Sequence, residues 1–360
     1  MSTGRKTLML LVASNRRRGA EVFGERLAAG LPAFGWDVDF VAIQGANTER
    51  VVDAITLTGG ESRARFDVST VLSLRRRMAR TRPAIVLANG GATLRYAVAA
   101  RSLLLHRPIL AYGSIGEPRY WMRSNWHLRL NRFLHRRADT ILAVSATTGR
   151  QLVSDLGIPP DRVHVAPTGV PPEFFVASEP RLEQLQMLFL GSLSPEKDPL
   201  AAVEVAVQIG KSHDVHLRLV GAGPLEAEIA AWGAETSERV TIELTGSVED
   251  VTPHLRWADL LLLTSRTEGL PGAVLEAGAA GVPTVAFDVG GTGETMVNGT
   301  SGILVPPGDV SAMVAAVERL AADRALLEAM GGEQRDHVRS NYSLDRAIAR
   351  FDQLLTGALL

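Results

Sequence analysis

Residues 260–291 read LLLLTSRTEGLPGAVLEAGAAGVPTVAFDVGG. Two short apolar runs in this stretch, residues 260–264 and 284–287, predict buried strands. Residues 271–280 between them predict a helix, because a proline stands in the first turn and helix-forming residues follow it. A strand, a helix and a second strand in this order are typical of parallel sheets covered by helices, so the stretch predicts an α/β fold.

The same alternation of expected strands and helices continues on both sides of residues 260–291. Strands are expected at residues 7–13, 36–43, 84–88, 108–112, 140–145, 163–165, 186–190, 216–220, 240–244 and 302–305. The last helices are expected at residues 310–330 and 344–355. Residues 171–180 are rich in proline and acid, so we interpret them as a linker. The chain therefore predicts two Rossmann-like domains with parallel sheets. They are residues 1–178 and 179–339, followed by residues 340–360 with a last helix.

Composition narrows the classes of protein. The 360 residues are 46% hydrophobic, which is enough to build two cores. No window holds 18 consecutive apolar residues, so we expect no membrane-spanning helix. The apolar run after Lys6 is too short for a signal peptide, and we interpret it as a first strand. The chain has no cysteine, which excludes disulfides and thiolate sites and fits a reducing compartment, so we expect a cytoplasmic protein.

Charge divides the chain into two halves. Residues 1–178 carry 25 basic and 13 acidic side chains, and the remainder carries 13 basic and 26 acidic ones. Arginines cluster at residues 16–18, 75–77 and 136–137, and Trp121 and Trp126 lie among further arginines. Such clusters favour an acidic acceptor or peripheral contact with an anionic membrane. The alternatives are solvated helix faces, or attraction between the basic domain and the acidic one.

Five loops follow expected strands of the second half, at residues 191–197, 221–224, 245–248, 265–272 and 290–294. Ligands of open parallel sheets bind beyond the carboxyl ends of the strands. The expected helix start near Pro271 offers free backbone N–H groups to an anion such as a pyrophosphate. Glu268 and Glu276 stand on either side of it and suit the hydroxyls of a sugar and a ribose. The alternative is that Glu276 pairs locally and Glu268 is a solvated loop acid.

The same region resembles a known family. The segments that carry the resemblance are residues 264–271, 275–277, 281–283 and 290–294, with supporting matches at residues 190–197, 219–224, 246–248, 143–145 and 167–170. Together they resemble glycosyltransferase family 4, the retaining, glycogen-synthase-like group with the GT-B fold. The resemblance implies two Rossmann-like domains with parallel sheets facing a central cleft, and a C-terminal helix in residues 340–360 that returns to the first domain. The spacing of Glu268 and Glu276 is similar to the E-x7-E motif of that family. The resemblance is strong in the second half and weaker before residue 138.

The resemblance implies an enzyme that transfers a sugar from a UDP- or GDP-sugar to a hydroxyl acceptor with retention, and needs neither a metal nor a further cofactor. Lys197 would hold the donor diphosphate, Glu268 would contact the donor sugar, and Glu276 would bind the ribose, with Glu268 and Lys197 serving catalysis. The implied donor-binding residues are Gly19, Gly191, Ser192, Lys197, Gly221, Gly246, Ser247, Val248, Glu268, Gly269, Leu270, Pro271, Gly272 and Glu276. A lipid-linked or acidic acceptor fits the resemblance, and no nucleic acid is implied.

Three positions depart from the family pattern. Ser192 stands where members often have arginine, Gly113 and Ser114 where many have histidine, and Thr168 where asparagine is frequent. Arg266 is one candidate replacement for the arginine. Two alternative functions stay open: a nucleotide-sugar epimerase on the same fold, and a catalytically silent nucleotide-sugar binding protein. The sequence Asp37-Val38-Asp39 also spells a metal-binding D-x-D, but it lies inside an expected strand, so we interpret its acids as solvated.

Overall fold

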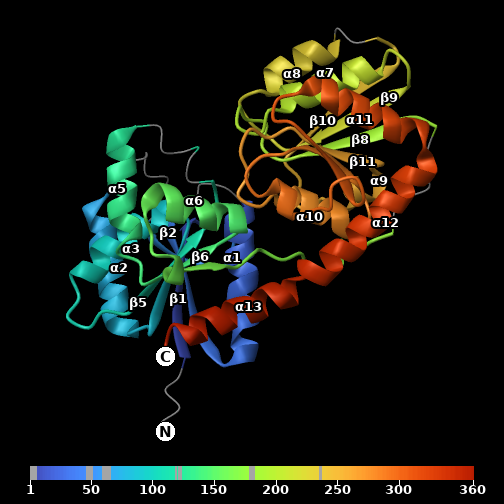
Figure 1. The fold of residues 1–360 in the computed structure, drawn as a ribbon. Coiled ribbons are helices and arrows are strands. Elements are labelled where there is room, and N and C mark those ends of the chain that lie inside the picture. Colours follow the sequence, from blue (N-terminus) through green and yellow to red (C-terminus); the bar gives the residue numbers. More distant parts are fainter. Residues whose placement is uncertain are drawn as a thin grey trace. The chain divides into compact units, whose positions relative to one another are not determined.

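The computed structural model describes residues 6–45, 52–58, 66–117, 120, 124–177, 183–234 and 237–360. The chain forms two compact units, Met1–Gly169 together with Asp345–Leu360, and Val170–Leu344 (Figure 1). Each unit contains one parallel sheet whose strands are joined by helices, which confirms the predicted α/β class. None of the described helices is both long and apolar enough to cross a membrane.

The sheet of the first unit has the strand order β3-β2-β1-β4-β5-β6-β7, and neighbouring strands pair in parallel. The strands are β1 (Lys6–Ser14), β2 (Trp36–Gln44), β3 (Ile55–Thr58), β4 (Ile85–Asn89), β5 (Ile109–Ser114), β6 (Thr140–Ala143) and β7 (Val163–Val165). The central strand β1 is buried from Leu8 to Val12, because helices cover both faces of the sheet.

Two layers of helices enclose this sheet. The helices are α1 (Gly19–Gly30), α2 (Val68–Thr81), α3 (Gly91–Ser102), α5 (Asn125–His135), α6 (Ala146–Leu156) and α13 (Leu344–Gly357). Side chains of α2, α3 and α6 pack into one cluster with Met9 and Leu11 of β1. The alternate residue Val12 faces the opposite side, where a Cβ on Gly24 of α1 would lie 2.9 Å from it.

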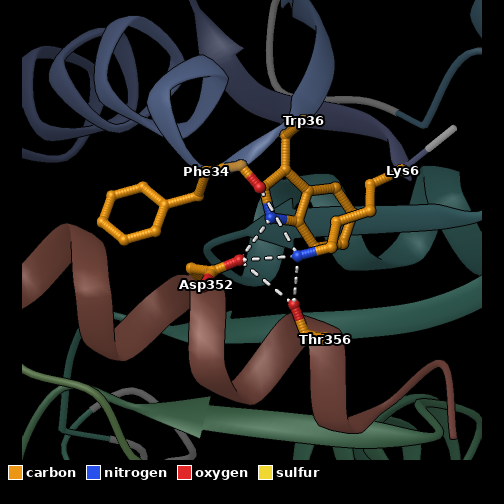
Figure 2. A network of polar contacts seen from close by, with 5 residues as sticks. All are labelled: Lys6, Phe34, Trp36, Asp352 and Thr356. Carbon is orange, nitrogen blue, oxygen red and sulfur yellow. Dashed lines mark hydrogen bonds and ion pairs between the residues drawn. The ribbon is translucent and has the colours of Figure 1, made fainter.

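Helix α13 is fastened to the first unit by a polar network (Figure 2). The Asp352 carboxylate accepts a hydrogen bond from the Trp36 indole at 2.8 Å and pairs with the Lys6 ammonium at 3.2 Å. The same ammonium donates to the Thr356 hydroxyl at 3.0 Å, and Phe351 packs against Phe23 of α1 with ring centroids 5.6 Å apart. The segment Asp345–Leu360 thus groups with the first unit although the second unit precedes it in sequence.

The sheet of the second unit has the order β10-β9-β8-β11-β12-β13, again parallel. Its strands are β8 (Leu185–Leu190), β9 (Val215–Val220), β10 (Val240–Gly246), β11 (Leu260–Leu263), β12 (Thr284–Phe287) and β13 (Gly302–Val305). Its helices are α7 (Pro199–Ile209), α8 (Glu226–Ala234), α9 (Thr252–Trp257), α10 (Gly272–Ala279), α11 (Val310–Ala322) and α12 (Arg324–Asn341).

Three boundaries differ from the sequence expectations by more than two residues. The last segment of the first unit begins at Asp345 rather than at residue 340, because α12 continues to Asn341. The helix expected at residues 310–330 is two helices, because Asp323 leaves the helical conformation and its carboxylate accepts a hydrogen bond from the Leu326 N–H at 2.9 Å, which starts α12. The first unit ends at Gly169, before the expected boundary at residue 178. The reason is that Val170 already belongs to the second unit, since its N–H donates to the Tyr342 carbonyl at 2.7 Å. Part of the expected linker, residues 178–180, lies outside the described residues.

Candidate functional site

The carboxyl ends of the parallel strands of the second unit meet at one edge of the sheet, and the loops there pack tightly together. Gly221 follows β9 with φ of +148°, and a Cβ on it would lie 1.8 Å from the Gly191 carbonyl oxygen after β8. A Cβ on Gly223 would lie 2.3 Å from the Leu193 carbonyl oxygen. Both positions therefore require glycine, and the two loops form one backbone surface.

A second pair of loops packs in the same way. Gly290 follows β12 with φ of +53°, and a Cβ on it would lie 1.8 Å from the Glu268 carbonyl oxygen. The N–H of Gly291 donates to that same carbonyl at 3.2 Å. The turn at Gly290 and Gly291 thus packs against the backbone of Glu268. This packing fixes the direction of the Glu268 side chain.

Lys197, from the loop after β8, meets Glu268, from the loop after β11. The Lys197 Nζ lies 2.6 Å from Oε1 of Glu268, and the Ser265 hydroxyl donates to the same oxygen at 2.6 Å. Glu268 is only 7% exposed, whereas the Lys197 side chain is 31% exposed. Within the described chain, both recorded bonds of this carboxylate reach Oε1, so Oε2 keeps its capacity to accept a hydrogen bond from a ligand.

The backbone that carries Lys197 is fixed by Asp198 and Thr264, which the sequence does not single out as site residues, and by Arg266, which it does. Asp198 adopts the left-handed conformation, with φ of +50°, directly before Pro199 at the start of α7. The Thr264 hydroxyl at the end of β11 donates to the Asp198 carbonyl at 2.8 Å, and Arg266 Nε donates to the Asp198 carboxylate at 2.8 Å. The pair Asp198-Pro199 signals a helix start, but its contact with β11 has no local signal.

Helix α10 begins directly after the loop that carries Glu268, and no described side chain blocks its N-terminus. Pro271 is the cap residue, and within the described chain no side chain caps the helix. Gly272 is exposed, and a Cβ on it would meet no described atom within 4 Å. Backbone N–H groups and the positive end of the helix dipole are therefore accessible to an anion, in the loop that also carries Glu268.

Comparison with known proteins identifies the family. The family model described as "Glycosyltransferase Family 4" matches residues 17–174, and the one described as "Glycosyl transferases group 1" matches residues 184–323. The chain belongs to these glycosyltransferases. The recognition made from the sequence motifs is therefore confirmed at the level of the family.

The chain has relatives with several named activities. It is 27% identical over 272 residues to 2-deoxystreptamine glucosyltransferase of Streptomyces kanamyceticus, covering 70% of this chain and 68% of that protein. It is 32% identical over 214 residues to D-inositol 3-phosphate glycosyltransferase of Geodermatophilus obscurus, covering 53% and 47%. It is 29% identical over 254 residues to an exopolysaccharide phosphotransferase of Streptomyces coelicolor, covering 70% of this chain but 25% of that protein. The matched part thus spans between a quarter and two thirds of these relatives.

Solved structures show the same fold. HepE of Anabaena, determined in complex with UDP and glucose, has a TM-score of 0.81 at 18% identity, and the alignment covers 98% of this chain and all of that one. At this identity the likeness concerns the fold alone, and it confirms the GT-B architecture of two Rossmann-like domains.

The remaining residues that the resemblance implies for donor binding lie on the same loops or on the first unit. Ser192 is exposed and its hydroxyl lies 2.8 Å from that of Ser194. Gly246 has φ of +71° and no described atom within 4 Å of a Cβ, and Ser247 beside it is exposed. Glu276 is half-buried within α10. Gly269, Leu270 and Pro271 are buried between β11 and α10, Val248 is half-buried after β10, and Gly19 begins α1.

One interpretation of the sequence is wrong. Asp39 of the D-x-D triplet is not a solvated acid, because Arg77 of α2 donates from Nε to its carboxylate at 2.8 Å. The hydrogen bond from the guanidinium to Asp39 raises the pKa of Arg77, against the opposing effect of burial. In the described ranges, no group of three or more histidine and acidic side chains is placed to hold a metal ion.

Proposed function

We propose that this glycosyltransferase transfers a sugar from a UDP-sugar to a hydroxyl group of an acceptor, with retention of the anomeric configuration. The observation that supports it most is the contact between Lys197 and Glu268 beside the open N-terminus of α10. A cation, an uncapped helix N-terminus and a carboxylate held in place match the diphosphate and the sugar of such a donor.

The charges assign a role to each group. The diphosphate of the donor accepts hydrogen bonds from Lys197 and from the first N–H groups of α10, which together offset its negative charge without a metal ion. Glu268 keeps one oxygen for Lys197 and Ser265, and offers the other to a hydroxyl of the donor sugar. Glu276, further along α10, accepts hydrogen bonds from the ribose hydroxyls.

In the reaction, the acceptor oxygen forms a bond to the anomeric carbon on the face from which the diphosphate departs. The bond between that carbon and the phosphate oxygen breaks, and its electron pair stays on the diphosphate. The proton of the acceptor hydroxyl passes to the departing phosphate oxygen. Lys197 and the α10 N–H groups stabilise the charge that grows on this leaving group, so no protein nucleophile takes part.

The names of similar proteins suggest the first compounds to test. HepE was solved with UDP and glucose, which favours UDP over GDP and makes UDP-glucose the first donor. Two relatives are named for 2-deoxystreptamine and for inositol 3-phosphate, both of which are cyclitols, so these are the first acceptors. Calorimetry with UDP and GDP, followed by NMR of the product anomeric proton, tests the proposal directly.

Each outcome is informative. Tighter binding of UDP than GDP and an α-linked product from an α-linked donor support the proposal, and unchanged turnover in EDTA supports the metal-independent form. An inverted product, or activity that requires added magnesium, would count against it. Nucleotide binding without turnover of any donor would favour the silent binding protein, and an epimerised sugar would favour the epimerase.

A further inference from the structure

Helix α5 (Asn125–His135), labelled in Figure 1, belongs to the first unit. It exposes an apolar stripe to solvent. Trp126 is 69% exposed, Leu130 39% and Phe133 50%. These positions are spaced by four and three residues, so their side chains lie on one face of the helix. We call these three residues the α5 stripe.

The opposite face of the helix fixes this orientation. Leu128 packs against the core of the first unit, and His135 is buried with its ring edge-on to Tyr112 at 4.7 Å between centroids. Burial lowers the pKa of His135 and so favours the neutral form of the ring within the core. Because 3.6 residues make one turn, burial of Leu128 and His135 places the α5 stripe on the outer side.

Positive charge borders the α5 stripe on one flank and at the C-terminal end of the helix. The sequence has no acidic residue between Glu117 and Asp139. Arg129, Arg136 and Arg137 are exposed, and the guanidinium of Arg137 lies 4.6 Å from the centroid of the Phe133 ring. A helix with an apolar face that includes tryptophan, bordered by arginines, has the composition of helices that lie in the interface of an anionic bilayer.

Several arginines of the other clusters expected from the sequence bind groups within the protein, so they are less available to lipid headgroups. Arg17 pairs with Glu25 at 3.1 Å, and Arg77 pairs with the half-buried Asp39. Arg75 donates to the Leu103 carbonyl at 3.0 Å. Trp121, with Arg119 and Arg123, lies outside the described residues. In the cluster at residues 136–137, by contrast, the guanidinium of Arg137 lies over the exposed ring of Phe133.

We propose that α5 docks the first unit on an anionic lipid surface, with the side chains of the α5 stripe entering the headgroup region and Arg129, Arg136 and Arg137 contacting acidic lipids. A second copy of the chain is a poorer partner for this face, because two arginine-rich faces would repel each other. A soluble acidic polymer would contact the arginines but would leave the apolar stripe in water. The anionic bilayer satisfies both parts of the face, and this inference goes beyond the proposed sugar transfer.

The test is cosedimentation of the full chain with vesicles of phosphatidylcholine alone and with 30% phosphatidylglycerol. We expect binding to the anionic vesicles only, and loss of it at 0.5 M NaCl. The double variant Trp126→Ser/Phe133→Ser should weaken binding by about tenfold or more, and Arg136→Gln/Arg137→Gln should do the same. The matched control is Phe34→Ser/Trp232→Ser, which removes aromatic side chains that are each 41% exposed outside α5, and it should bind like the parent chain.

Circular dichroism and UDP affinity show whether each variant is folded, and neither should change. This separates the two proposals, because failure of UDP to bind would refute the donor site and leave the vesicle result standing. No binding to anionic vesicles at low salt would refute docking, as would equal binding by the α5 variant and the control. A dimer in sedimentation that Trp126→Ser/Phe133→Ser abolishes would assign the α5 stripe to self-association instead.

Discussion

The substitution Lys197→Met tests the centre of the proposed donor site. It removes the ammonium group but keeps most of the apolar stem, so the loop after β8 retains its packing. In the free protein, Glu268 would then keep only the hydrogen bond from Ser265, and its carboxylate is 7% exposed. A buried charge that loses its partner destabilises the fold, and we expect a loss of about 1–3 kcal/mol in the free energy of unfolding.

The effect on ligand binding follows from the same contact. A hydrogen bond between charged groups contributes about 1.5–3 kcal/mol, so UDP should bind about ten to 150 times more weakly to the variant. The matched control is Lys211→Met. Lys211 is exposed, its Nζ bonds the Gln208 side chain, and it lies before β9, at the opposite edge of the sheet from the site.

Isothermal titration calorimetry with UDP measures the affinities, and urea unfolding measures the stabilities. Lys211→Met should leave both unchanged within about 0.5 kcal/mol, as a surface substitution does. If folded Lys197→Met bound UDP as tightly as the parent chain, the diphosphate assignment of Lys197 would be wrong. If Lys197→Met and Lys211→Met weakened UDP binding equally, the loss would come from the reduced positive charge of the whole protein rather than from the donor site.

Three further predictions follow. Glu276→Gln should weaken the binding of free UDP, whereas Glu268→Gln should reduce turnover more than UDP affinity, and equal losses in both assays would contradict separate roles. Gly290→Ala should destabilise the fold by about 1–3 kcal/mol more than Gly299→Ala in urea, because both have positive φ but only the first forces a Cβ onto a carbonyl oxygen. Burial opposes ionisation of Asp352, but hydrogen bonds from Trp36, Lys6 and Thr356 outweigh it and lower its pKa. Its stabilising effect should be complete well above pH 4 and fall as the pH drops below that, and a stability difference from Asp352→Asn that stayed constant from pH 6 to pH 3 would refute this.

The central strands could be predicted because burial on both faces leaves a continuous apolar run. The run at residues 7–13 became β1, and the run at residues 186–190 became β8, each within one residue at either end. The edge strand β3 (Ile55–Thr58) was missed, because it pairs with β2 on one side only and its side chains are exposed or half-buried. The sequence of such a strand shows no continuous apolar run of the kind that predicts a buried strand.

The residues of the candidate site also fall into those that the sequence predicts and those that it does not. Glu268 and Lys197 could be named from the motifs that surround them, and the structure places their side chains in contact. The contact itself joins residues 71 positions apart and has no local signal. Thr264 and Asp198 were missed because they act through a backbone carbonyl and a left-handed conformation, and the residue type alone determines neither.

The return of α13 to the first unit has a consequence for synthesis on the ribosome. Residues 1–169 leave the ribosome before residues 170–360. Until α13 is made, Phe23 of α1 lacks its partner Phe351, and the indole of Trp36 lacks its partner Asp352. The 175 residues from 170 to 344 come between, which at about 5–20 residues per second takes about 9 to 35 s. During this interval the nascent first unit exposes an apolar surface that chaperones can recognise. Completion of the first unit is thereby coupled to translation of the whole second one.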